Sequence, residues 1–104
     1  MRKLHHFGIP TQIKREGESY SEDMRLFLTD PMASINKIEF LRFEKESQMP
    51  DILKTHAHVA YEIDDFATEM AGKKVVMEVT KLSDHMSIAF IEEDGIAIEL
   101  IKLS

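Results

Sequence analysis

The stretch Ile98-Glu99-Leu100-Ile101-Lys102-Leu103 has the composition of a buried β-strand, yet its second position is a carboxylate. Burying an unpaired carboxylate is costly, so Glu99 needs a cation, a hydrogen-bond network or water beside it. One other hexamer, Ile38-Glu39-Phe40-Leu41-Arg42-Phe43, has the same order of aliphatic, glutamate, apolar, apolar, basic and apolar residues. The repeat predicts two related strands, each with one glutamate that needs a partner.

A strand-like segment with histidine precedes each of these hexamers. The two segments are Leu4-His5-His6-Phe7-Gly8-Ile9 and His56-Ala57-His58-Val59-Ala60-Tyr61. Glu39 follows His6 by 33 residues, whereas Glu99 follows His58 by 41 residues. The longer interval contains a helix-like segment of eight residues, Asp65 to Gly72, which accounts for the difference. The chain therefore reads as one unit that occurs twice, with a helix missing from the first copy. Two histidines and two glutamates form a ligand set for a divalent metal.

The composition narrows the classes of protein to which the chain can belong. Its 104 residues, 43% of them hydrophobic, suit a single domain, with half-modules of about residues 1–50 and 51–104. A net charge of −6 argues against binding to a nucleic-acid backbone, which requires a basic surface. The absence of cysteine excludes disulfides, thiolate nucleophiles and cysteine-ligated zinc.

The sequence shows no targeting or membrane segment. The basic start of the chain is not followed by the apolar run of a signal peptide, and no apolar stretch approaches the length of a transmembrane helix. We therefore expect a cytoplasmic protein with a small-molecule substrate and with no nucleic-acid or membrane partner.

Local patterns predict the elements of each half. Strands are expected at Leu4–Thr11, Met24–Thr29, Ile35–Glu44, His58–Asp64, Val75–Thr80, Met86–Glu92 and the final stretch. The segment Asp65 to Gly72 has capping residues at both ends, which favours a short helix. Asp94-Gly95 is typical of a two-residue hairpin turn. Residues 12–23 are expected to form a surface loop, and residues 45–55 a connector with a turn of helix.

The period of two along a strand predicts which side chains share a face. His6 and Gly8 should point to one side of the first strand and His5 to the other. On the strand predicted at Ile35–Glu44, Glu39 should share its face with Leu41. The two histidines of the first strand are therefore expected on opposite faces.

Three segments resemble the vicinal oxygen chelate superfamily, which includes glyoxalase I, methylmalonyl-CoA epimerase, extradiol dioxygenases and bleomycin-resistance proteins. The segments are His5–Ile9, His58–Phe66 and Ala89–Leu100. The resemblance implies an α+β fold in which paired βαβββ-type modules form a cupped mixed sheet. This chain departs from the family pattern because its first module lacks the helix.

The resemblance also implies a metal site. Carried over to this chain, the family's ligands correspond to His6 and Glu39 in the first module, and to His58 and Glu99 in the second. They would hold a divalent ion such as zinc, nickel, cobalt or manganese, with open positions for two neighbouring substrate oxygens. The metal would act as a Lewis acid, while a carboxylate that can leave it, Glu39 or Glu99, would be the catalytic base.

The leading functional hypothesis is a metal-dependent lyase or isomerase of the glyoxalase or epimerase type, acting on a small oxygenated substrate. Two alternatives stay open: a non-catalytic small-molecule-binding protein of the bleomycin-resistance type, and an extradiol-type dioxygenase. A fourth protein ligand at Glu39 argues against the dioxygenase, because the iron site of such an enzyme keeps three protein ligands. The family also contains proteins that bind without catalysing, so the fold does not decide between these functions.

The missing helix predicts a homodimer. In the second half, Phe66 and Met70 can cover the outer face of the sheet, but the first half has no equivalent helix. The outward-pointing apolar side chains of the first half are Phe7, Ile9, Ile38 and Phe40. Monomers rarely expose such a patch, and a second copy would bury it on both chains. The alternative is that the connector folds over this face through Ile52 and Leu53.

Overall fold

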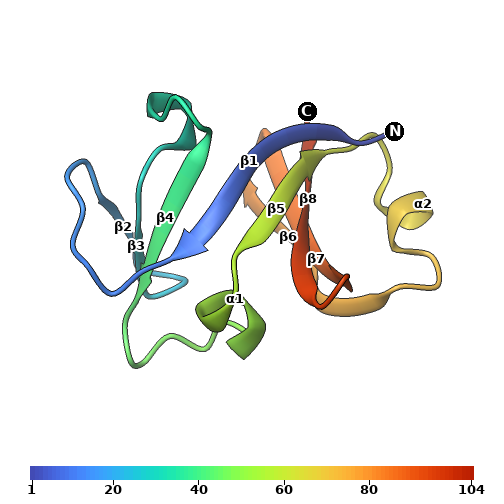
Figure 1. The fold of residues 1–104 in the computed structure, drawn as a ribbon. Coiled ribbons are helices and arrows are strands. Elements are labelled where there is room, and N and C mark those ends of the chain that lie inside the picture. Colours follow the sequence, from blue (N-terminus) through green and yellow to red (C-terminus); the bar gives the residue numbers. More distant parts are fainter.

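A computed structural model that describes residues 1–104 contains one mixed sheet of eight strands, which curls into a cup (Figure 1). The strands follow one another across the sheet in the order β2-β3-β4-β1-β5-β8-β7-β6. Their bounds are β1 Lys3–Pro10, β2 Ser19–Ser21, β3 Leu26–Leu28, β4 Ile38–Phe43, β5 His58–Glu62, β6 Lys74–Ser83, β7 Met86–Glu93 and β8 Ile96–Leu103. The helical elements are the 3₁₀ turn η1 (Pro31–Ala33) and the α-helices α1 (Asp51–Thr55) and α2 (Phe66–Met70).

The sheet consists of two modules that meet at the antiparallel pair of β1 and β5. In the first module β1 pairs in parallel with β4, and in the second module β5 pairs in parallel with β8. The other neighbours are antiparallel. The expected α+β fold, with paired modules in a cupped mixed sheet, is therefore confirmed. Only the second module has a helix, α2, after its first strand.

Strand β2 lies inside the stretch that the sequence predicted to be a surface loop. It has only three residues, with the sequence Ser-Tyr-Ser, which is too short to show an apolar period. Its pairing with β3 makes it a strand. The loop before it is anchored by an ion pair in which a guanidinium nitrogen of Arg42 lies 2.7 Å from a carboxylate oxygen of Glu18. In the first module, a loop and a short edge strand thus take the place of the helix.

Local chemistry explains where other elements begin and end. Helix α2 starts after Asp65, whose carboxylate accepts a hydrogen bond from the backbone N–H of Thr68, as predicted for its N-cap. The turn between β7 and β8 has positive φ angles of 56° at Asp94 and 78° at Gly95, as the predicted hairpin requires. None of the helices has both the length and the apolar character needed to cross a membrane.

The hydrophobic core lies on both faces of β8, because its side chains alternate between two buried clusters. Ala97 and Ile101 pack on the inner face with Leu53 of α1. Ile98 and Leu100 pack on the outer face, where α2 covers the second module as predicted. Helix α1 therefore lies on the inner side of the sheet, and α2 on the outer side.

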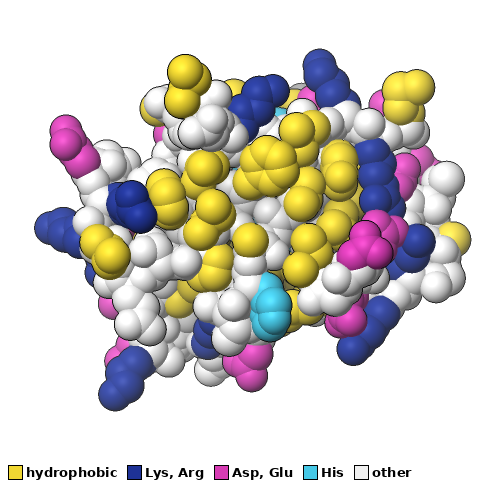
Figure 2. Space-filling model, in the orientation of Figure 1, with side chains coloured by type: hydrophobic (Ala, Val, Ile, Leu, Met, Phe, Trp, Pro, Cys, Tyr) yellow, Lys and Arg dark blue, Asp and Glu magenta, His cyan; other side chains and the backbone are white.

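The first module has no helix over its outer face, and that face exposes apolar side chains. Leu4 and Phe7 on β1 are 40% and 37% exposed. A hollow of about 370 Å³ beside β1 and β5 is lined mostly by hydrophobic residues. Figure 2 shows an apolar area near the middle of the face that carries β1 and β5. The alternative in which the connector covers this face is wrong, because Leu53 is buried in the inner cluster.

We predict that two copies of the chain pair through this outer face, because a two-fold pair buries the same apolar patch on both. Light scattering at micromolar concentration should then give about twice the chain mass of 12.0 kDa. Phe7→Lys places a charge in the patch and should shift the protein to the monomer. Val79→Lys, at an exposed position of β6, is the control and should leave the mass unchanged. A wild-type mass near 12.0 kDa would reject the pairing.

Candidate metal centre

The four predicted ligands lie together on the inner face of the sheet, although they come from four different strands. The residues that offer one ligand atom each, all within 4.8 Å of one another, are His6, Glu39, His58 and Glu99. Nε2 of His58 is 3.1 Å from Oε1 of Glu99. Nε2 of His6 is 3.4 Å from Oε1 of Glu39 and also 3.4 Å from Oε1 of Glu99. Atoms that bind one cation at about 2.0–2.2 Å lie about 3–4 Å apart, so the cluster has the dimensions of a coordination site.

The strand register brings Glu39 and His58 together across Gly8. Gly8 on β1 is the cross-strand partner of Glu39 on β4 and of His58 on β5. A Cβ on Gly8 would overlap the imidazole ring of His58, which lies directly over the glycine. Glycine is therefore required here for space, so that a neighbouring side chain can approach the backbone closely.

A second row of residues repeats this arrangement. Ala60 on β5 is the partner of His6 on β1 and of Glu99 on β8, and Ala60 is completely buried. Each row holds one histidine and one glutamate on either side of a residue with little or no side chain. Sequence reasoning did not assign Gly8 or Ala60 to the site. The signal that could have found them is a small residue two positions after each ligand histidine.

His5 lies beside His6, so the prediction that the two rings point to opposite faces is wrong. The pairing of β1 with β5 shifts register between Leu4 and His6, which makes His5 the extra residue of a β-bulge. The Nδ1 atoms of His5 and His6 are 2.8 Å apart, and their ring centroids are 5.1 Å apart. The extra residue interrupts the period of two, and the alternation rule therefore fails at this position.

The charges of the cluster shift the pKa values of its members. Burial lowers the pKa of His6, but the carboxylates of Glu39 and Glu99 outweigh burial and raise it to about 9. Burial raises the pKa of Glu99, but the contacts with His58 and His6 outweigh it and lower the pKa to about 2. Burial also lowers the pKa of His5, and the neighbouring His6 lowers it further.

A divalent cation fits these residues. Nε2 of His6 is buried between two carboxylates and has no hydrogen-bond partner, which is rare for a buried polar atom. Two neutral imidazoles and two carboxylates together balance the charge of a divalent ion, and zinc and its neighbours prefer such ligands. The orphaned nitrogen and the donor set both agree with a metal centre, and Gly8 leaves room for the His58 ring to take its place in it.

A small apolar cavity of about 90 Å³ borders the cluster. Its polar wall consists of Glu39, His58 and Glu99, and most of its other lining residues are hydrophobic. Three of these, which come from β4 and from the connector, are Phe43, Met49 and Leu53. A ligand in this cavity would lie against the candidate metal ligands on one side and against hydrocarbon on the others.

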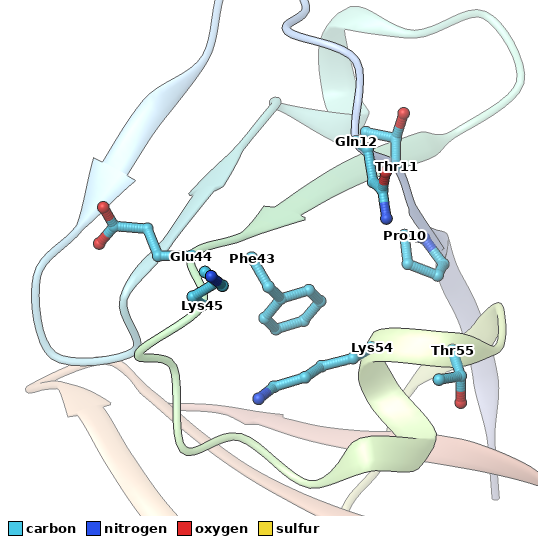
Figure 3. A pocket seen from close by; sticks show the side chains of 8 residues that line it. All are labelled: Pro10, Thr11, Gln12, Phe43, Glu44, Lys45, Lys54 and Thr55. Carbon is cyan, nitrogen blue, oxygen red and sulfur yellow. The ribbon is translucent and has the colours of Figure 1, made fainter.

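A larger hollow of about 460 Å³ lies between the ends of β1 and β4 and helix α1 (Figure 3). Figure 3 shows the carboxylate of Glu44 pointing away from it, and that carboxylate accepts a hydrogen bond of 2.5 Å from the Tyr20 hydroxyl. The amine of Lys54 donates to the carbonyl of Ser47. The hollow contains no histidine and its carboxylate is engaged elsewhere, so we do not regard it as a reaction centre.

Two solved structures resemble the chain over nearly its whole length. A hypothetical protein from Bacillus halodurans C-125 matches with a TM-score of 0.64 at 15% identity, and the match covers 99% of this chain and 95% of that one. Methylmalonyl-CoA epimerase from Mycobacterium tuberculosis matches with a TM-score of 0.64 at 17% identity, over 98% of this chain and 88% of that one. The chain has the vicinal oxygen chelate fold.

Sequence comparison alone gives no relative, because no protein-family model and no curated protein matches the chain. At these low identities the structural likeness concerns the fold. The four clustered side chains of this chain can hold a divalent ion.

Gly8→Ala should displace the His58 ring, because the added Cβ overlaps it. We expect a loss of about 1–3 kcal/mol in folding stability from overpacking. We also expect zinc affinity to fall at least about tenfold. Urea unfolding and zinc titration measure both effects, and wild-type values for Gly8→Ala would contradict the arrangement.

Metal affinity should rise with pH, because the cation replaces a proton on His6. A pKa of about 9 means that His6 of the metal-free protein carries this proton throughout the neutral range. Zinc binding should therefore strengthen about tenfold per unit between about pH 6 and pH 8, and bound zinc should be lost toward about pH 5. Calorimetry in buffers of different ionisation enthalpy should detect about one proton released per ion. Affinity that does not depend on pH would exclude His6 as a ligand.

Proposed function

We propose that the protein is a metal-dependent isomerase or lyase, which moves a proton on a small oxygenated substrate with an apolar body. The observation that carries the proposal is that the apolar cavity is bordered by Glu39, Glu99 and His58. A substrate in that cavity has its reactive carbon beside groups that can bind a cation and accept a proton. The volume of about 90 Å³ favours a small substrate group.

The two carboxylates are suited to different tasks. Glu99 is within hydrogen-bond distance of His58, has a side chain that is only 10% exposed, and has a pKa lowered to about 2, so it is a fixed and permanently ionised ligand. Glu39 contacts only His6, at 3.4 Å, and its side chain is 16% exposed. Glu39 is therefore the carboxylate that can turn toward the substrate, and we assign it as the base.

In the proposed reaction, a C–H bond beside a substrate carbonyl breaks, its electron pair moves to the carbonyl oxygen, and the proton passes to the Glu39 carboxylate. A proton delivered by a second donor to the opposite face of the same carbon gives an epimer. The Glu39 proton returned to the adjacent enediolate carbon gives an isomer, and loss of a group with its bonding electrons from the neighbouring carbon gives a lyase reaction. A divalent cation held by His6, His58 and Glu99, while Glu39 turns to the substrate, would supply Lewis acidity for the negative charge on that oxygen. The hydrophobic lining keeps water away from the carbon that has lost its proton.

The alternatives are a dioxygenase and a binding protein without catalysis. Four protein ligands leave fewer open positions than the three of a typical dioxygenase iron site, which argues against oxygen chemistry. One of the matched structures is an epimerase, which supports proton transfer. The binding protein differs from the enzyme in one measurable respect, namely proton exchange on a bound ligand.

Glu39→Gln should remove the proposed base while leaving the other three candidate metal ligands in place. In deuterated buffer, the zinc-loaded protein should exchange the proton beside the carbonyl in members of a panel of small 2-oxo acids, hydroxyketones and branched thioesters, as followed by NMR. Glu39→Gln should slow this exchange at least about 100-fold, while its zinc affinity stays within about tenfold of wild type. Glu99→Gln should lose zinc, and the control Glu44→Gln should change neither property. Saturable binding of a panel member without any exchange would contradict the enzyme and support the binding protein.

A further inference from the structure

We infer that His5 is a positioning residue, which accepts the Nδ1–H of His6 and so aims Nε2 of His6 at the carboxylates and at the cation that they hold. The inference rests on the proposed metal site, but it concerns a residue outside the four ligands. It stands on the geometry of two neighbouring imidazole rings.

The contact between the two rings is short and enclosed. The Nδ1 atoms lie 2.8 Å apart, and the ring planes meet at 74°. His6 is only 4% exposed, and His5 is half-buried. A single proton lies between two nitrogens at this distance, so one ring donates and the other accepts.

The second nitrogen of His6 decides which ring donates. Nε2 of His6 faces Glu39 and Glu99, each at 3.4 Å. To bind a cation, Nε2 must offer its lone pair, and the proton of the neutral ring is then on Nδ1. The charged ring carries protons on both nitrogens and also donates from Nδ1. In the cation-bound state and in the charged state, Nδ1–H of His6 is therefore the donor and Nδ1 of His5 the acceptor, whereas a neutral ring protonated only on Nε2 would reverse these roles.

The β-bulge makes this contact possible. His5 is the extra residue between the paired positions Leu4 and His6, and such an extra residue re-aims a side chain. Histidine ligands of metals generally donate their second N–H to a carboxylate, a backbone carbonyl or water. Here a neutral imidazole takes that place, so the ring of His6 is oriented without a further negative charge beside Glu39 and Glu99.

The second module provides an internal comparison. The residue before His58 is Ala57, whose side chain has no hydrogen-bond acceptor, and Nδ1 of His58 has no hydrogen-bond partner. The His58 ring is fixed by packing, with Gly8 beneath it and the Phe90 ring edge-on at a centroid distance of 5.5 Å. The two imidazoles are thus held by different means, and only His6 has a side-chain partner for its Nδ1 atom.

The test compares His5→Leu, which fills the space without an acceptor, with His5→Asn, which places an amide oxygen near the former Nδ1. Co²⁺ alone is the probe, because its visible absorption reports the coordination geometry. We expect His5→Leu to weaken Co²⁺ binding about 10–100-fold and to alter the spectrum. His5→Asn should stay within about threefold of wild type. His56→Leu removes an exposed imidazole outside the site and is the matched control.

A second measurement needs no metal. Long-range proton–nitrogen NMR of the metal-free protein should show a slowly exchanging Nδ1 proton on His6 in the wild type and in His5→Asn, but not in His5→Leu. Equal Co²⁺ affinity and equal spectra for wild type and His5→Leu would overturn the inference. A wild type that binds no Co²⁺ would overturn the proposed metal site, while the NMR signal still decides the hydrogen bond. If circular dichroism shows that His5→Leu is unfolded, the NMR spectrum of the metal-free wild type decides the question. A His6 ring that is protonated only on Nε2 in that spectrum rejects the inference.

Discussion

The burial of one carboxylate, that of Glu99, is the constraint on which the rest of the structure depends. It lies on β8, whose apolar neighbours fill both faces of the sheet, and only 8% of the residue is exposed. Such a charge is tolerated only when it is paired, and its partners His58 and His6 come from β5 and β1. Slippage of β8 by one residue would turn the carboxylate into the hydrophobic cluster under α2, so polar pairing and apolar packing fix the same register.

The clustering of the four candidate ligands and the paired modules could be predicted from the sequence, because a polar residue within an apolar strand is visible in that strand alone. Glu99 is the clearest case, and the repeat then led to Glu39 and to the two histidines. Strand β2 and the bulge at His5 could not be predicted, since both depend on hydrogen bonds to residues of other strands. The position of the connector was also open, because an apolar Leu53 suits either face and only the packed structure selects the inner one.

The two modules are alike at their centre and different at their edges. All four ligands lie on β1, β4, β5 and β8, the four middle strands of the sheet. The first module therefore keeps its two candidate ligands in place although it has no helix and its strands β2 and β3 have only three residues each. The connector changes the site more, because Met49 and Leu53 enter the apolar cavity and limit its volume to about 90 Å³.

The rows of paired residues also bear on how the chain reaches its folded state. His6 and Glu99 are 93 positions apart in the sequence, yet they face each other across a single intervening strand. Closing so long a loop has an entropic cost, and contacts between residues so distant in sequence slow folding. A cation that needs both residues is therefore captured only after the first and last strands have come together. It would then join the two ends of a chain that has no cysteine, and its binding free energy would act on the completed fold alone.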